Sequence, residues 1–445
     1  MPFYIKKLNN NIVFLALIHF LLGLFISGRR DIATIWGYGI LLYGLIHIVR
    51  YRNKYDDASI FASYMVGIEV VLRTVGASVL WEYGKYSTIL LLLVGMFLEN
   101  IKFLRVNILS FTYFVCLLPS IALMPDVKFN YLRQMISGNL SGPLCLFISF
   151  IYFRQRKFSE ENLINLFRAL LLPVCSLLGL IFIRAPAFQN ITFTSEANFQ
   201  MSAGFGPNQV STVLGVSLII IGLARIFNLK IFKNSMLDYL FLSVSIGVAL
   251  LTFARGGVIA PVIAMVSTLF ISGGIKKYNI EYKGIISLFI LMIGLSYLSS
   301  NLTKGLINSR YASLLYVLNP QQTTLAGRTK IMAIDLEIFL DNILMGVGPG
   351  SARALRWEYG FDSEVGAHSE FTRMLAEHGL FGFISLFSIL MLSFQEYRKR
   401  TDHNKVLLAC MSIFGTLTMF HSAFRIALPG FIYGLSYVIL NFRKQ

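Results

Sequence analysis

Stretches of about 20 apolar residues recur along nearly the whole chain. A helix of roughly that length spans a bilayer, because lipid offers backbone amides no hydrogen-bond partner and a helix satisfies them internally. Only 14% of the 445 residues are charged, whereas soluble domains carry about a quarter. The sequence therefore predicts an integral membrane protein and excludes an ordinary soluble fold.

The hydrophobic pattern predicts an all-α fold, a polytopic transmembrane helical bundle with about fourteen spans. The first span follows Lys6 and Lys7 and has no small-residue cleavage site after it, so we expect a retained helix and not a removed signal peptide. The expected spans are residues 11–27, 32–49, 58–80, 86–98, 106–124, 138–153, 163–183, 207–226, 236–253, 257–273, 284–300, 379–394, 405–422 and 426–441.

These spans divide the chain into three expected regions. Residues 1–300 form a bundle of about eleven spans, residues 301–378 form one large outer loop, and residues 379–445 add about three spans. Loops longer than about 15 residues are usually functional or disordered. This loop contains apolar runs with a helical pattern at Ile331–Leu344 and Phe371–Leu375. We therefore expect it to be folded and to carry the functional site.

The formal net charge of +17 would suit a nucleic-acid-binding protein, but the positions of the cations favour lipid. With the N-terminus inside, the expected cytoplasmic connections and termini hold more than twice as many Lys and Arg residues as the short outer loops. This asymmetry agrees with the positive-inside rule for membrane proteins. The sequence thus predicts a multi-pass protein with both termini cytoplasmic and the large loop outside.

Cysteines and common catalytic motifs say little about the outer face. All four cysteines lie within apolar spans, which makes a disulfide framework or a cysteine zinc site improbable and predicts buried packing thiols; they are Cys116, Cys145, Cys175 and Cys410. The sequence lacks the GxxxxGK[ST], HExxH and GxSxG patterns. This disfavours a built-in ATPase, zinc protease or serine hydrolase.

Two arginines beside glycines are candidate anion-binding residues. Arg255 stands between two hydrophobic spans, and Gly327-Arg328 precedes a short expected helix in the large loop. One interpretation of Arg255 is an interfacial residue whose side chain reaches lipid headgroups. The other is an anion clamp, because a guanidinium stays charged and has a planar fork that suits phosphate, and neighbouring glycines allow close backbone approach.

The large loop also contains a glycine-rich turn, Gly346–Gly350, and a histidine, His368. The turn is more often a plain turn, but its amides can also cradle an anion. A histidine titrates near neutrality and can accept a proton from a hydroxyl group, although a lone histidine is more often a hydrogen-bonded structural residue. The position of His368 just ahead of a span favours the catalytic interpretation.

Together these motifs resemble the O-antigen polymerase and O-antigen ligase superfamily, bacterial membrane glycosyltransferases that use polyprenyl-diphosphate-linked glycans. The ligase pattern is His, then Asn, Ser or Gln, then nine residues and Gly-x-x-Gly, and it fits His368-Ser369 through Gly379 and Gly382. Family members also carry an Arg-Gly after a central span, a Gly-Arg opening the large loop and a Pro-Asn opening a span, matched by Arg255-Gly256, Gly327-Arg328 and Pro207-Asn208. The resemblance covers roughly residues 205–382.

The resemblance implies a GT-C-like bundle and a metal-independent, inverting transfer that needs no cofactor. Arg255 and Arg328 are the residues we expect to neutralise the charge that builds on the diphosphate leaving group. His368 is the expected base for the acceptor hydroxyl, and its alternative role is to bind phosphate as a cation. The large loop has no clean DxD metal pair. The further substrate-binding candidates are Ser369, Arg184, Asn208, Arg353, Arg356 and Gly348.

Glu69 and Arg73 form a separate charged pair in the third expected span. Their spacing of four residues places them on one face of a helix. The pair either neutralises itself and holds helices together or lines a groove for the lipid carrier. The structural interpretation is the more common one.

The main hypothesis is a polymerase of O antigen, capsule or exopolysaccharide on the outer face of the inner membrane. It would transfer glycan from an undecaprenyl-diphosphate-linked donor to a repeat-unit acceptor. An O-antigen ligase would use the same donor but move the glycan to lipid A core or another acceptor, and a transporter would do no chemistry but should show an internal repeat. The expected partners are the lipid-linked donor, the glycan acceptor, membrane lipid, a flippase and a chain-length regulator, and not nucleic acid. The sugar and its linkage do not follow from the motifs.

Overall fold

The computed structural model describes residues 3–99, 106–194, 196–271, 282–312, 326–361, 366–367, 369–400, 402–422 and 424–442. These residues form an all-α fold, as the hydrophobic pattern predicts, apart from two strands of two residues each. The helices are α1 (Phe3–Phe25), α2 (Arg30–Tyr51), α3 (Asp57–Val75), α4 (Tyr83–Leu98), α5 (Ile108–Val115), α6 (Phe129–Phe153), α7 (Glu160–Arg184), α8 (Pro207–Ile226), α9 (Ser235–Leu251), α10 (Gly256–Ile271), α11 (Tyr282–Leu302), α12 (Leu306–Ala312), α13 (Ala326–Asp341), α14 (Ser351–Leu355), α15 (Glu370–Lys399), α16 (Asp402–Ser422) and α17 (Leu428–Leu435). The short 3-10 helices are η2 (Pro119–Leu123), η3 (Phe188–Asn190) and η4 (Gln200–Ser202), and the strands are β1 (Lys157–Phe158) and β2 (Ile439–Leu440).

Several helices begin where a polar side chain can satisfy a free backbone amide. Asn107 caps α5 by accepting from the amide of Leu109, Ser159 caps α7 by accepting from the amide of Asn162, and Asn234 caps α9 by accepting from Leu237. Ser, Asn, Asp and Thr are favoured at this position for that reason. Pro207 opens α8, where the missing amide hydrogen of a proline costs nothing. These local signals set where the apolar helices start.

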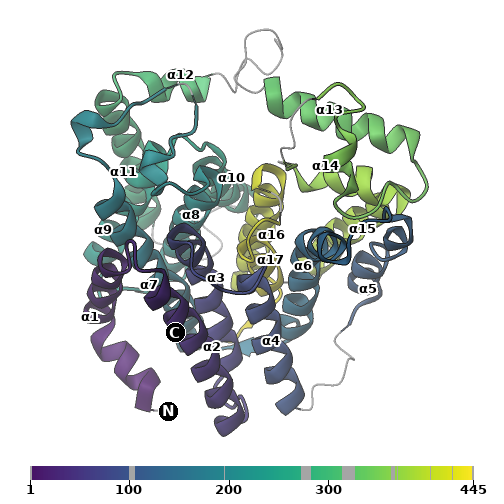
Figure 1. Ribbon diagram of the computed structural model, residues 1–445. Helices are drawn as coiled ribbons and strands as arrows, with labels where there is room; N and C mark the ends of the chain where they lie inside the picture. Colours follow the sequence, from purple (N-terminus) through teal and green to yellow (C-terminus); the bar gives the residue numbers. More distant parts are fainter. Residues whose placement is uncertain are drawn as a thin grey trace.

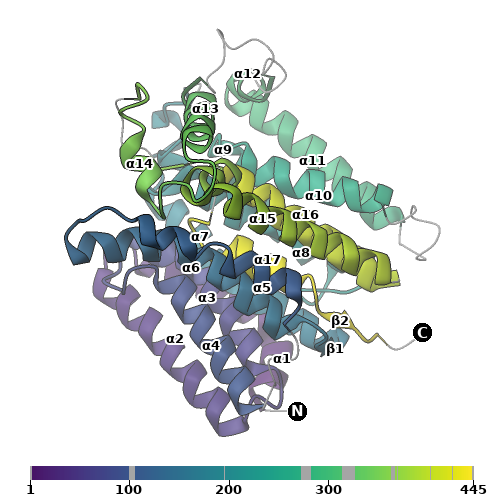
Figure 2. The ribbon, with the colours of Figure 1, turned by 90° about the vertical axis from the view of Figure 1, so that its right-hand side faces the viewer.

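The helices pack side by side into a bundle, with α12, α13 and α14 gathered at one end of it (Figure 1). Both chain termini lie towards the opposite end, which Figure 2 shows from a second direction. The central helix is α8, whose apolar stretch is completely buried, whereas most of the apolar stretch of α11 is exposed. A fully buried apolar helix belongs to the protein interior, and an exposed one in this setting faces lipid. The bundle therefore has a protein-lined centre around α3, α7 and α8.

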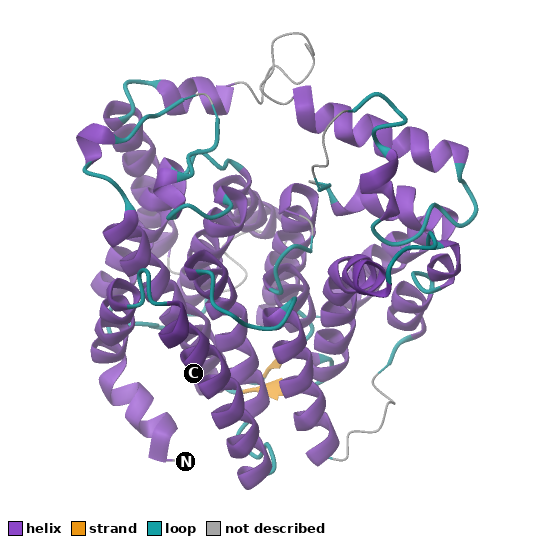
Figure 3. Cartoon of the chain, in the orientation of Figure 1, coloured by secondary structure: helices purple, strands orange, loops and turns teal. Residues whose placement is uncertain are grey.

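Two short strands connect the segment after α17 to the segment between α6 and α7. β1 and β2 pair in parallel, with Lys157 opposite Ile439 and Phe158 opposite Leu440 (Figure 3). Arg400 adds hydrogen bonds to the carbonyl oxygens of Tyr437 and Val438, at 2.6 and 2.7 Å. The segment after α17 is thus held against the turn between α6 and α7, far from α12–α14.

Each of the fourteen expected spans overlaps a helix, from α1 to α11 and from α15 to α17. Seven of the described helices are long and apolar enough to cross a membrane. However, α5 and α17 have only eight residues each, or about 12 Å at 1.5 Å per residue, which is shorter than the hydrocarbon core of a bilayer. The count of fourteen spans, the three regions and the orientation of the termini therefore stay predictions.

The large loop contains a small helical layer that packs on α15. Its apolar centre is formed by Ile334 and Ile338 of α13, Ala352 of α14 and Ala376 of α15. The predicted helical run at 331–344 falls largely within α13. The run at 371–375 lies inside α15, which begins at Glu370 and so starts before the expected span at 379. This layer brings the loop residues close to the end of the bundle.

Candidate functional site

A polar cavity of about 200 Å³ lies at the end of the bundle that carries α12–α14. It is bounded by the C-terminal end of α3, the start of α4, α6, the start of α8, the start of α15 and the turn between α16 and α17. Four cationic side chains and two carboxylates line it, from Arg73, Lys85, Arg373, Arg425, Glu82 and Glu370. Concave sites with converging polar groups are the usual places for ligands. This cavity is therefore our candidate functional site.

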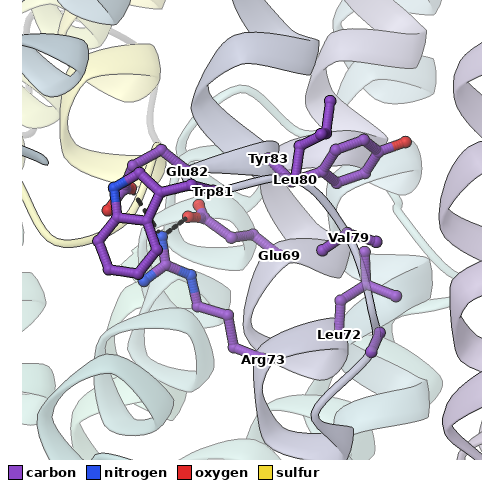
Figure 4. A pocket seen from close by; sticks show the side chains of 10 residues that line it. Glu69, Leu72, Arg73, Val79, Leu80, Trp81, Glu82 and Tyr83 are labelled. Atoms are coloured by element: carbon purple, nitrogen blue, oxygen red, sulfur yellow. Dashed lines mark hydrogen bonds and ion pairs between the residues drawn. The ribbon is translucent and has the colours of Figure 1, made fainter. Parts of the chain in front are cut away.

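One wall of the cavity is a network of ion pairs between α3 and α4. Arg73 contacts Glu69 and Glu82, both at 2.8 Å, and Lys85 contacts Glu82 at 2.7 Å. Figure 4 shows Arg73 between the two carboxylates, beside a second pocket of about 210 Å³. Glu69 also accepts a hydrogen bond of 2.7 Å from the backbone amide of Ala427, just ahead of α17. The prediction that Glu69 and Arg73 share a helix face is confirmed, and these contacts favour the structural interpretation.

The opposite wall is built around Arg373 of α15. Its guanidinium forms ion pairs with Glu370 and Glu377 and donates a hydrogen bond of 2.8 Å to Asn139 of α6. All three charged side chains are buried. A buried guanidinium is stable only when its donors are satisfied, and two carboxylates and an amide do this here. Arg373 thus fixes the first turns of α15 against α6.

The segment that leads to His368 is held at the same cavity by Arg425. Arg425 lies in the turn between α16 and α17, and its Nη2 atom donates to the carbonyl oxygens of Gly366 and Ala367, at 2.8 and 2.7 Å. From the other side, the amide of Phe424 donates to Glu370 at 3.3 Å. His368 itself lies outside the described residues, but its neighbours on both sides are placed at the cavity.

Ser369, the predicted partner of His368, is buried immediately ahead of α15. Within the described part of the chain its hydroxyl oxygen has no hydrogen-bond partner. An unsatisfied buried hydroxyl costs free energy, so such groups often await a ligand or a water molecule. The position of Ser369 agrees with the predicted substrate-binding role, which stays a prediction.

Arg255 lies at the start of α10, where it joins the bundle to α12. Its guanidinium is buried and donates a hydrogen bond of 2.8 Å to the carbonyl oxygen of Arg310, while Arg310 donates back to the carbonyl oxygen of Phe253. An interfacial residue that reaches for lipid headgroups would instead be exposed. Arg255 is therefore buried within the protein, where α10 contacts α12 at the start of the large loop.

Two of the sequence motifs meet around a histidine that the sequence did not single out. The ring of His421, at the end of α16, lies where a Cβ atom on Gly256 would collide with it. His421 Nε2 also lies 3.0 Å from the hydroxyl of Thr212, which donates to the carbonyl oxygen of Asn208. The Pro-Asn and Arg-Gly motifs thus come together, and the glycine after Arg255 makes room for His421.

Glycines in the large loop and in α15 allow the loop to pack closely against α15. Gly379 has φ +60° and breaks α15, and the amide of Leu380 donates to the carbonyl oxygen of Ile343 at 2.7 Å. The amides of Val347 and Gly348 donate to carbonyl oxygens of α15, at 3.1 and 3.0 Å. Because these amides are engaged in the fold, the geometry favours a structural turn over an anion cradle at Gly348.

The remaining predicted residues lie elsewhere. Arg184, at the end of α7, donates to the carbonyl oxygens of Thr74 and Ala203 at 2.7 and 3.3 Å. Arg353 is exposed on α14. The side chain of Arg328, in the first turn of α13, lies outside the described residues.

Arg356 is buried and forms an ion pair of 2.8 Å with Asp335 of α13. Burial raises the pKa of Asp335, and the guanidinium of Arg356 opposes that rise. Thr372 donates to the same carboxylate at 3.1 Å, so the pair ties α13 to α15. These contacts favour a structural role for Arg356. Among the described residues, no group of three or more His, Cys, Asp or Glu side chains is arranged to hold a metal ion.

Fold and site together define a multi-pass helical membrane protein with a charged cavity at the end of the bundle that carries α12–α14. Residues 240–387, about a third of the chain, match the family model described as O-antigen ligase. The match supports the O-antigen polymerase and ligase superfamily and confirms the resemblance that the motifs predicted. It spans Arg255, Arg328, His368 and Gly379, and it indicates a glycosyltransferase-like activity. No curated protein matches the chain.

Proposed function

We propose that the protein is a polysaccharide polymerase that transfers glycan from an undecaprenyl-diphosphate-linked donor to a repeat-unit acceptor on the outer face of the inner membrane. The observation that carries this proposal is the cavity at which Arg425 holds the two residues ahead of His368. It lies at the end of the bundle next to the large loop, where a lipid-linked substrate and a polar acceptor can meet. The family match supports the same chemistry.

In the proposed reaction the acceptor hydroxyl oxygen attacks the anomeric carbon of the donor sugar. A carbon–oxygen bond forms as the bond from the anomeric carbon to the diphosphate breaks, and the diphosphate leaves with the electron pair. His368 takes the hydroxyl proton, since an imidazole near neutrality is a competent base. Attack from the face opposite the leaving group inverts the configuration at the anomeric carbon.

Arg255 and Arg328 are the proposed partners of the leaving diphosphate. Fixed guanidinium groups in a site shielded from water stabilise developing negative charge without reorganising at the moment of reaction. The burial of Arg255 and its bond to Arg310 support a fixed position. We propose that this clamp acts without a metal ion.

An O-antigen ligase is the second candidate, because the matching family model is described as O-antigen ligase. The two activities share the donor and differ in the acceptor. One reconstitution experiment, with purified protein in proteoliposomes and lipid-linked repeat units, distinguishes the two activities. A polymerase yields longer lipid-linked glycans from the donor alone, whereas a ligase consumes donor only when a separate acceptor such as lipid A core is added. Failure to consume donor under both conditions would overturn the glycosyltransferase proposal.

A further inference from the structure

Helix α13 of the large loop packs against the protein through one apolar side. Ile331, Ile334 and Ile338 are buried on that side, at the spacing that places residues on one helix face. Asp335 on the same side is held by Arg356 and Thr372. The other faces of α13 do not take part in this contact.

A second face of α13 and the turn after it is apolar and exposed. Leu336, Leu340, Ile343 and Leu344 are 42, 63, 49 and 71% exposed. Leu336 and Leu340 lie four residues apart on one face of α13, and Ile343 and Leu344 follow in the turn after the helix. We refer to these four residues as the α13 stripe. Single exposed leucines are ordinary on a protein surface, but a continuous stripe on one helix marks a surface that meets an apolar partner.

A third face of α13 carries charge and is turned towards the segment after α14. Lys330 donates a hydrogen bond of 2.8 Å to the carbonyl oxygen of Gly360, and Asp341 accepts one of 2.7 Å from the hydroxyl of Tyr359. Glu337 lies on this face as well and is exposed. Lys330 and Asp341 therefore lie beside the exposed apolar residues of α13 and contact the segment after α14.

The α13 stripe is continuous with the exposed surface of a candidate membrane span. The amide of Leu380 in α15 donates to the carbonyl oxygen of Ile343, so the two residues adjoin. From Leu380 the exposed apolar side chains run on along α15 through Phe383 and Phe387, which are both 52% exposed. Exposed apolar residues on a span face the acyl chains of lipid.

The direction of α13 agrees with a place at the membrane surface. Figure 1 shows α13 lengthwise, running across the direction of the bundle helices, and Figure 2 shows it nearly end-on. A helix that runs across the spans lies parallel to the membrane plane. At the end of the bundle, its stripe can therefore meet the lipid beside α15.

We propose that the α13 stripe rests among the acyl chains of the membrane leaflet nearest to α12–α14, and so anchors the large loop to the lipid surface. The partner is the apolar layer of a bilayer, and the contact extends the lipid-facing side of α15. This role goes beyond the glycosyl transfer proposed above and does not depend on it, because it requires only that the spans lie in a membrane.

The test places spin labels on single cysteines at Leu340 and Leu344, with Glu337→Cys as the matched control on the charged face of the same helix. Each variant also carries Cys116→Ser, which removes the half-buried native thiol, and is reconstituted in phosphatidylcholine vesicles. Collision with oxygen, which concentrates in lipid, is compared with collision with a water-soluble nickel complex. We expect a several-fold higher oxygen-to-nickel ratio at positions 340 and 344 than at 337.

A second measurement uses an environment-sensitive fluorophore on the same cysteines and lipids that carry a nitroxide on the acyl chain. Strong quenching at 340 and 344 and weak quenching at 337 support the proposal. Equal ratios and equal quenching at all three positions would overturn it and would leave the α13 stripe exposed to water. Because neither readout involves glycosyl transfer, this result is independent of whether the protein is a polymerase.

Discussion

The contact between Arg425 and the segment before His368 allows a quantitative test by Arg425→Ala. One guanidinium nitrogen of Arg425 donates two hydrogen bonds, of 2.8 and 2.7 Å, to the carbonyl oxygens of Gly366 and Ala367. A hydrogen bond that involves a charged group contributes about 1.5–3 kcal/mol, and because both bonds share one nitrogen we assign about 2–3 kcal/mol to the pair.

If this energy holds the segment in its productive position, its loss slows elongation about 30- to 150-fold, since about 1.4 kcal/mol corresponds to a tenfold change in rate. Arg425→Lys should lose less, because an ammonium group can still donate to one carbonyl oxygen. The assay is the initial rate of glycan elongation in proteoliposomes, with donor binding measured in parallel and Arg133→Ala, an exposed cation on α6, as the control. An Arg425→Ala rate equal to that of Arg133→Ala would refute the positioning argument.

Three further outcomes are expected. A membrane-impermeant thiol reagent should label a cysteine at Ser309 from outside and one at Lys399 only from the cytoplasmic side, and the reverse pattern would contradict the predicted orientation. Elongation should persist in excess EDTA and without nucleotide, and a strict need for either would rule out the proposed arginine clamp. Gly379→Ala should lower stability by about 1–3 kcal/mol or more, because the new side chain meets the carbonyl oxygen of Ile343 at a positive φ. Thermal unfolding in detergent measures this loss, and Gly294→Ala, where a Cβ atom meets open space, should have a much smaller effect.

Hydropathy predicts where the helices lie, because the need to satisfy backbone amides in lipid leaves few alternatives. It says little about charged residues that neutralise one another. Glu370, Arg373 and Glu377 fall within the expected outer loop, residues 301–378, and hydropathy does not predict that they pair within the first turns of α15 and are buried. Their spacing of three and four residues is the signal that could have placed them on one helix face.

The residues of the site also divide into those that short sequence motifs predict and those that only the packing of the helices brings together. Arg255, Asn208 and His368 follow from short motifs, and the structure brings the motifs of the first two together, because His421 lies against Gly256 and close to Thr212, which donates to Asn208. His421 and Arg425 stand alone near the end of an apolar segment, without a motif. They are far in sequence from the residues that they contact. The packing of α16 against α8 and α10 brings His421 to Gly256 and Thr212, and the turn after α16 brings Arg425 to Gly366 and Ala367. Pairing over such distances has no local sequence pattern.

The most direct test of the proposed mechanism compares His368→Ala with His368→Lys by the length of the glycan chains that each variant makes. Lysine keeps a positive charge but is a poor base near neutral pH, because it does not readily lose its proton. If His368 is the base, both variants should lose about 10²- to 10⁴-fold in rate and leave single repeat units at unchanged protein level and donor binding. Recovery in His368→Lys alone would show that the residue only binds phosphate, and near-normal chains in His368→Ala, at matched membrane abundance, would contradict the assignment of the catalytic centre.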